Sequence, residues 1–186
     1  MSTVLDELVS QTQRPLIGPI EPIARRIAQD RLERVGVIAT PLTIASGTYE
    51  RALAEHAPDT AVFSHASHHL APLVQTDTAN TEAIDAEIRA VVSPLVEQGI
   101  ADVILGCTHY PIVFERFTAC FPTIRFIDPA HEQAKTIRKL LTEADALTDR
   151  RRGSLTICTS GDPAADRDVC ERLGIFEQTT PRFLKR

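Results

Sequence analysis

The segment Ala101–Phe117, ADVILGCTHYPIVFERF, decides how the rest of the chain is interpreted. An apolar run ends at Gly106, and a thiol, a hydroxyl and an imidazole follow directly as Cys107, Thr108 and His109. A Tyr-Pro pair then opens a stretch of helical character, because proline is favoured in the first turn of a helix. The order predicts a buried strand, a tight turn and a helix, with chemically active side chains in the turn.

On both sides of this segment, short apolar runs alternate with amphipathic stretches, a pattern typical of βαβ units. Strands are expected at 34–40, 59–65, 101–107, 123–128 and 154–161, with a short one at 14–20. Helices are expected at 3–12, 21–33, 41–57, 80–99, 110–121, 129–147 and 162–174, and Pro94 is expected to bend or interrupt its helix. The predicted fold class is therefore α/β, a mostly parallel sheet with helices on both faces.

Ligands of such folds bind at the carboxyl ends of the strands. Five polar residues are expected near those ends: Thr40, His65, Cys107, Asp128 and Ser160. Their position alone makes each of them a candidate, and the chemistry of the side chains must choose between them.

The Cys107 turn carries the most reactive combination of these groups. A helix start favours an anion, so we expect a lowered pKa for the Cys107 thiol. His109 can exchange protons with that thiol or with a leaving group. Thr108 and His109 together could hold a substrate carboxylate. The competing interpretation is an inert buried cysteine, and it is the one that fits Cys120, Cys158 and Cys170.

Composition excludes several classes of protein. The chain has 186 residues and a formal net charge of -5, which argues against a nucleic-acid surface. We interpret the one basic run, Arg150–Arg152, as a solvated loop. No apolar stretch approaches the roughly 20 residues that cross a bilayer, and the N-terminus lacks the features of a secretion signal. We expect a cytoplasmic protein without membrane or nucleic-acid partners.

Neither the four cysteines nor the six histidines show the clustered spacing of a metal site. No Cys-x-x-Cys pair is present, and in a reducing compartment the cysteines should stay thiols. His68 and His69 are adjacent, so their side chains would diverge. We expect no bound metal.

The motif LGCTHYP, Leu105–Pro111, resembles the second active-site motif of glutamate racemases, in the aspartate/glutamate racemase superfamily. Other segments resemble the same family in order and spacing, and the resemblance covers essentially the whole chain. They are PLIGPIEP at 15–22, GVIATPLTIASGTY at 36–49, APLVQ at 71–75 (a Pro-Leu-Val-Glu loop in the family), IDPAHEQA at 127–134 and TSGDP at 159–163.

The resemblance implies a cofactor-independent interconversion of L- and D-glutamate, which supplies D-glutamate for peptidoglycan. In that mechanism two cysteines flank the α-carbon, and one removes a proton while the other returns one on the far side. The α-hydrogen is barely acidic, so the site must stabilise a carbanion-like transition state. By resemblance, Cys107 is the second of these thiols. Thr108 and His109 would contact the substrate glutamate, and His109 would assist Cys107.

The sequence departs from the family pattern at its start. The family's Asp-Ser-Gly, Tyr-Gly and Cys-Asn-Thr-Ala segments have no counterpart here, so we expect that about the first third of a typical member is absent. Residues 15–130 would form the second racemase domain nearly complete, and residues 1–14 and 131–186 a remnant of the first. We therefore expect a chain that is inactive on its own and exposes an apolar face, with self-association and a possible homodimer as consequences.

Two further departures concern the choice of substrate. Gln75 stands where the family usually has glutamate, and glutamine cannot act as a base. Residues Ala66–His69 replace an Ala-Cys-Pro segment. Preference for glutamate or aspartate is left open by these changes.

Two alternative functions remain at this stage. One is a single-cysteine relative, decarboxylase- or isomerase-like, that protonates one face of its substrate. The other is a non-catalytic remnant that binds an acidic ligand at Thr108 and His109.

Overall fold

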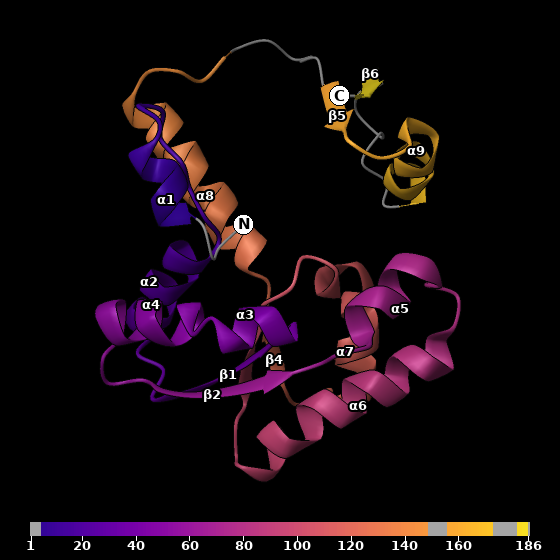
Figure 1. Cartoon of the computed structure of the whole chain (residues 1–186). Helices are drawn as coiled ribbons and strands as arrows, with labels where there is room; N and C mark the ends of the chain where they lie inside the picture. Colours follow the sequence, from indigo (N-terminus) through magenta and orange to yellow (C-terminus); the bar gives the residue numbers. More distant parts are fainter. Residues whose placement is uncertain (1–4, 149–155, 173–181, 186) are drawn as a thin grey trace. The chain divides into compact units, whose positions relative to one another are not determined.

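The computed structural model describes residues 5–148, 156–172 and 182–185. The chain divides into two compact units, Met1–Ala144 and Asp145–Arg186 (Figure 1), which are described separately. The expected basic loop Arg150–Arg152 lies outside the described residues.

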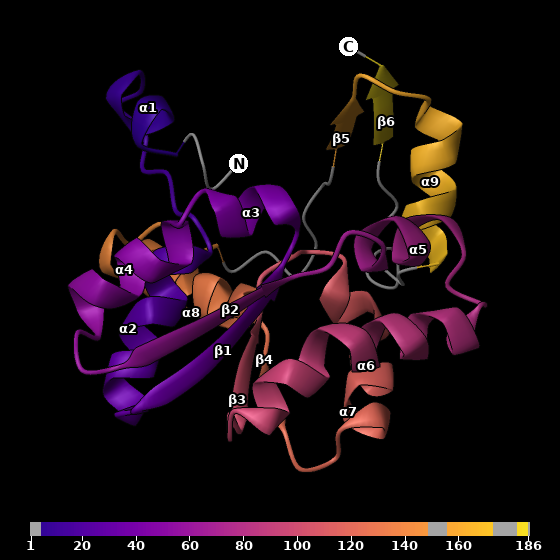
Figure 2. The ribbon, with the colours of Figure 1, turned by 60° about the horizontal axis from the view of Figure 1, so that its bottom comes forward.

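A parallel four-stranded sheet in the order β2-β1-β3-β4 forms the centre of the first unit (Figure 2). Its strands are β1 (Arg34–Ala39), β2 (Ala61–Ala66), β3 (Asp102–Leu105) and β4 (Arg125–Ile127). The two inner strands β1 and β3 are apolar and almost wholly buried, as expected of a parallel sheet covered on both faces. The predicted α/β fold class is confirmed.

Helices α2 (Ile20–Asp30) and α4 (Thr48–His56) cover one face of the sheet. Their apolar positions, among them Ile23, Ile27 and Leu53, pack against Val35 and Val37 of β1. Helix α8 (Pro129–Glu143) packs against α2. Its Gln133 Nε2 also donates a 2.7 Å hydrogen bond to the Ile17 carbonyl, in the segment just before α2.

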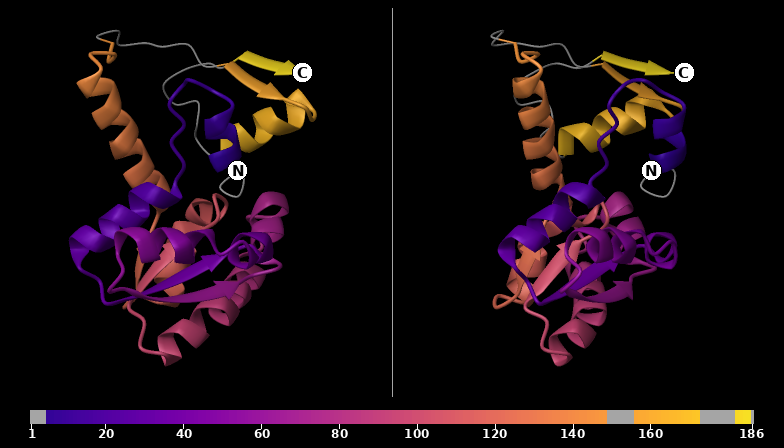
Figure 3. Two further views of the ribbon diagram at one scale, coloured as in Figure 1. Left: turned by 60° about the vertical axis from the view of Figure 1, so that its left-hand side comes forward. Right: turned by 90° about the vertical axis from the view of Figure 1, so that its left-hand side faces the viewer.

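Helices α5 (Leu70–Thr76), α6 (Thr81–Glu97) and α7 (Phe114–Cys120) pack against the other face, so the sheet is covered on both sides (Figure 3). The Asn80 side chain caps α6 by accepting a 3.2 Å hydrogen bond from the Ala83 N–H. The helix continues through Pro94 to Glu97, so the expected interruption at this proline is not seen.

Three local predictions for this unit are wrong. Residues 14–20 form no strand. Residues 41–57 form two helices, α3 (Pro41–Ala45) and α4, because Gly47 adopts a φ of 61°, which ends α3 before α4 begins. The segment 71–75 lies inside α5 rather than in a loop. The expected N-terminal helix is present as α1 (Leu5–Ser10).

In the second unit, β5 (Thr156–Thr159) pairs in parallel with β6 (Arg182–Lys185), a strand that the sequence pattern did not predict. The helix α9 (Pro163–Arg172) follows β5, as expected. The assignment of residues 1–14 and 131–186 to a remnant of another domain stays a prediction. Among the residues that the structure describes, no helix is both long and apolar enough to cross a membrane.

Candidate active site

The Cys107 turn is fixed to the sheet by the glycine that precedes it. The Gly106 N–H donates a 2.8 Å hydrogen bond to the Ile38 carbonyl at the end of β1. A Cβ atom on residue 106 would lie 3.0 Å from that carbonyl oxygen and 3.1 Å from the Tyr49 ring. Only glycine therefore lets the end of β3 approach β1 this closely, and the approach places Cys107 at the carboxyl edge of the sheet.

Within the turn, the thiol and the imidazole are neighbours. Cys107 Sγ lies 3.7 Å from His109 Nδ1, and both side chains are half-buried. The Tyr110 N–H closes the turn with a 3.0 Å hydrogen bond to the Cys107 carbonyl. Thr108 is exposed. The geometry allows proton exchange between Cys107 and His109, and it leaves Thr108 accessible to a ligand.

The expected lowering of the Cys107 pKa is wrong. Burial raises the pKa of this thiol, and the backbone N–H groups of His109 and Tyr110 offset the rise only in part. The chain after the turn is a single 3₁₀ turn, η2 (Tyr110–Val113), so no long helix directs its positive end at the sulfur. In the absence of a ligand Cys107 is therefore a neutral thiol, the form that donates a proton.

On the α4 side of the turn, a buried tyrosine lies close to the thiol. Burial raises the pKa of Tyr49, and the negative charges of a Cys107 thiolate and of Asp128 add to the rise. Asp128 follows β4 and caps α8, accepting a 2.9 Å hydrogen bond from the Ala130 N–H. Asp128 also pairs with His131, whose Nδ1 lies 3.4 Å from the carboxylate.

On the α6 side, a polar cluster formed by Ser67, Glu87 and Tyr110 lies near the turn. Ser67 is buried directly after β2, donates a 3.2 Å hydrogen bond to Glu87 Oε2, and accepts one of 3.1 Å from the Leu70 N–H. Tyr110 is fully buried, and burial raises its pKa; Glu87, and Cys107 when it is a thiolate, add to the rise, and the Ser67 hydroxyl opposes it. Sequence patterns gave no reason to select Tyr49, Ser67 or Glu87, although a polar residue directly after a buried strand was a usable signal for Ser67.

Three other residues were expected near the carboxyl ends of strands: Thr40, His65 and Ser160. Thr40 follows β1 and its hydroxyl shares a 3.0 Å hydrogen bond with that of Thr43. His65 lies inside β2 rather than after it. Ser160 follows β5 in the second unit, so it does not belong to this edge of the four-stranded sheet.

Three residues singled out as departures from the family pattern are exposed: His68, His69 and Gln75. The described residues contain no cluster of three side chains able to hold a metal ion.

The Asp/Glu/Hydantoin racemase family model matches residues 1–137. The chain is 40% identical over 130 residues to the glutamate racemase of Desulforudis audaxviator, a match of 68% of this chain and 46% of that protein. It is 29% identical over 175 residues to the glutamate racemase of Latilactobacillus sakei, a match of 92% of this chain and 63% of that protein. The chain thus spans about half to under two thirds of the length of these relatives.

Solved structures of glutamate racemases resemble this chain over nearly its whole length. A glutamate racemase isoform from Bacillus anthracis superposes with a TM-score of 0.88 at 28% identity, covering 99% of this chain and 70% of the other. Glutamate racemase from Thermus thermophilus in complex with β-chloro-D-alanine superposes with a TM-score of 0.82 at 28% identity, covering 100% and 69%.

Proposed function

This chain belongs to the Asp/Glu/Hydantoin racemase family, and from that premise we propose that it carries one catalytic thiol of a glutamate racemase. The reaction is the cofactor-independent interconversion of L- and D-glutamate in the cytoplasm, for peptidoglycan synthesis. The observation that supports the proposal most strongly is the 3.7 Å contact between Cys107 Sγ and His109 Nδ1 at the carboxyl edge of a parallel sheet.

In this proposal Cys107 moves a proton on one face of the substrate's α-carbon. Because burial raises its pKa, the resting thiol is ready to protonate a carbanion-like intermediate. In the reverse direction Cys107 must first lose its proton, and His109 is the nearest group that can accept it. Thr108, exposed beside them, would bind the substrate carboxylate.

Inversion requires a second proton donor on the opposite face of the α-carbon. The first unit contains only one other cysteine, Cys120, which is the last residue of α7, and Cys158 and Cys170 lie in the second unit. Burial and the Asp85 carboxylate raise the pKa of Cys120 as well, but this thiol lies at the end of α7, shortly before β4 begins, and so toward the opposite edge of the sheet from Cys107. We therefore expect this 186-residue chain to handle one face of the substrate and to form no D-glutamate from L-glutamate by itself.

Exchange of the glutamate α-hydrogen with solvent tests whether this chain acts on only one face of the substrate. The purified chain is incubated separately with L- and D-glutamate in D₂O, and the α-proton signal and the enantiomer ratio are followed. The expected result is slow α-deuteration of one enantiomer without inversion, lost in Cys107→Ser and retained in the control Cys120→Ser. Sustained racemisation by the wild-type chain would refute the one-thiol proposal, and equal exchange by Cys107→Ser would remove Cys107 from the reaction.

A single-thiol relative is the second candidate, favoured by the same cysteine inventory and by the exposed Gln75 in place of a family glutamate. Such an enzyme protonates one face as its whole reaction and would decarboxylate an arylmalonate. Turnover of an arylmalonate without any exchange of glutamate would support this candidate over the first. Binding of glutamate with neither reaction would indicate the non-catalytic remnant.

A further inference from the structure

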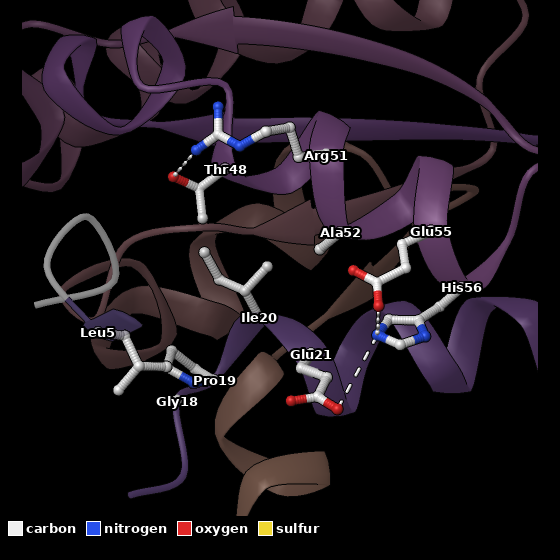
Figure 4. A pocket seen from close by; sticks show the side chains of 10 residues that line it. All are labelled: Leu5, Gly18, Pro19, Ile20, Glu21, Thr48, Arg51, Ala52, Glu55 and His56. Atoms are coloured by element: carbon white, nitrogen blue, oxygen red, sulfur yellow. Dashed lines mark hydrogen bonds and ion pairs between the residues drawn. The ribbon is translucent and has the colours of Figure 1, made fainter. Parts of the chain in front are cut away.

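A pocket of about 360 Å³ lies in the first unit, and none of its lining residues belongs to the Cys107 turn (Figure 4). Its volume is within the range of small-molecule sites. The lining residues that matter here come from the start of α2 and from one face of α4: Ile20, Glu21, Thr48, Arg51, Glu55 and His56.

One end of the pocket gathers one imidazole and two carboxylates. His56 Nε2 lies 3.9 Å from Glu21 Oε1 and 4.0 Å from Glu55 Oε1. These separations are too long for hydrogen bonds, so the three groups do not satisfy one another. They are shorter than two hydrogen bonds laid end to end, so one nitrogen can bond His56 and either carboxylate at once. A primary ammonium offers a positive charge and three N–H donors, which matches the two carboxylates at this end.

Across the described parts of the chain, no group of three side chains could hold a metal ion.

Arg25 already occupies part of this end. Its Nε and Nη2 donate hydrogen bonds of 3.1 and 2.6 Å to Glu21 Oε1. Arg25 therefore competes with an incoming cation for Glu21, and its removal should make the acidic end more attractive to an ammonium.

The other end of the pocket is cationic. Arg51 Nη1 donates a 2.6 Å hydrogen bond to the Ser46 carbonyl, and Nη2 lies 3.4 Å from Thr48 Oγ1. In Figure 4 the guanidinium points toward Thr48 and away from Glu55. Glu55 follows four residues later, which is about 6 Å along a helix. The remaining N–H groups of Arg51 can bind a carboxylate or a phosphate. The half-buried Ala52 and the mostly buried Ile20 lie between the two ends and form the apolar floor of the pocket.

We propose that this pocket binds a small zwitterion, with a primary ammonium at Glu21, Glu55 and His56 and an anionic group at Arg51. The two charges are joined by a short aliphatic spacer that packs on Ile20. Because the charged side chains are largely exposed, each contact contributes little, and the dissociation constant is on the order of 1 mM and rises with salt.

A series of ω-amino acids tests the proposal by measuring the spacing of the two charges. The ¹⁵N-labelled chain is titrated with β-alanine, 4-aminobutyrate, 5-aminovalerate and 6-aminohexanoate, with butylamine and butyrate as single-charge probes. We expect saturable amide shifts at Ala52 and His56, strongest for one of the longer members and at least fivefold weaker for either single-charge probe.

Charge-neutral variants locate the ligand within the pocket. Glu55→Gln and Arg51→Gln should each weaken binding of the best probe at least fivefold, and Arg25→Gln should strengthen it at least twofold. Lys139→Gln removes an exposed charge from α8 and should leave binding unchanged. The proposal is overturned if no probe gives saturable shifts up to 50 mM, if a single-charge probe binds equally well, or if folded pocket variants bind like the wild type.

Discussion

Replacing Gly106 by alanine should both destabilise the first unit and displace the Cys107 turn. The new Cβ would lie 3.0 Å from the Ile38 carbonyl oxygen and from Ala39 Cβ, and 3.1 Å from Tyr49 Cε2. Two of these neighbours belong to the backbone or the Cβ position of β1, which cannot rotate away. Relief therefore requires β3 and the turn that follows it to shift by a few tenths of an ångström.

The size of the effect follows from the cost of overpacking a core. An extra methyl group in a well-packed site costs about 1–3 kcal/mol of the free energy of unfolding. With a urea dependence of roughly 1–3 kcal/mol per molar, the unfolding midpoint should fall by about 1 M. The same shift should change the separation of Cys107 and His109, so the rate of Cys107 alkylation should differ from that of the wild type.

Tyrosine fluorescence can follow the first unit alone, since the chain has two tyrosines, Tyr49 and Tyr110, and both lie in that unit. Alkylation at Cys107 is read by mass spectrometry of its peptide. Gly161→Ala is the matched control, because its Cβ would meet only Thr159 Oγ1 at 3.4 Å. An unchanged urea midpoint together with an unchanged alkylation rate in Gly106→Ala would show that this glycine does not hold the turn.

Three other outcomes can be measured on the same chain. Burial raises the pKa of Cys107 in the folded state, so its contribution to stability should be complete below the ordinary thiol pKa of about 8.5 and decline above it. Urea titrations at pH 7 to 10 should show a smaller decline in Cys107→Ser, and Cys120, Tyr49 and Tyr110, whose pKa values are also raised, account for the remaining decline. Tyr110→Phe should change the free energy of unfolding by less than about 1 kcal/mol, because among the described residues the buried Tyr110 hydroxyl meets only the Ser67 hydroxyl, without the geometry of a full hydrogen bond; a larger loss of stability in urea would contradict this. Leu140 and Leu141 are 41% and 39% exposed on α8, so the chain should self-associate; sedimentation should show less association for Leu140→Lys, and a monomer at every concentration of wild type would refute it.

The elements that the sequence predicted correctly are those with strong local patterns. The four strands of the main sheet are short apolar runs between turn residues, and α6 and α8 have clear caps at Asn80 and Asp128. Such signals need no knowledge of distant contacts. The LGCTHYP motif likewise placed Cys107 and His109 in one turn, and the structure brings their side chains together.

The wrong or missing predictions concern features that depend on contacts between residues far apart in the sequence. The apolar residues at 14–20 looked like a strand, but this segment leads into α2 and contacts α8 through the Ile17 carbonyl. The pairing of β5 with β6 joins segments far apart in the chain, which no local period reveals. The direction of the Cys107 pKa shift depends on burial, which the sequence alone did not give. Tyr49 and Ser67 approach the turn only through the packing of α4 and β2.

The most direct test of the central claim is whether glutamate occupies the Cys107 turn. Iodoacetamide alkylation of the four cysteines is followed peptide by peptide with increasing glutamate, at constant ionic strength. The account predicts that glutamate slows alkylation at Cys107 in a saturable way, leaves Cys120 unaffected, and loses this protection in Thr108→Ala and His109→Ala. Alkylation of Cys107 at the same rate with and without saturating glutamate would contradict the account.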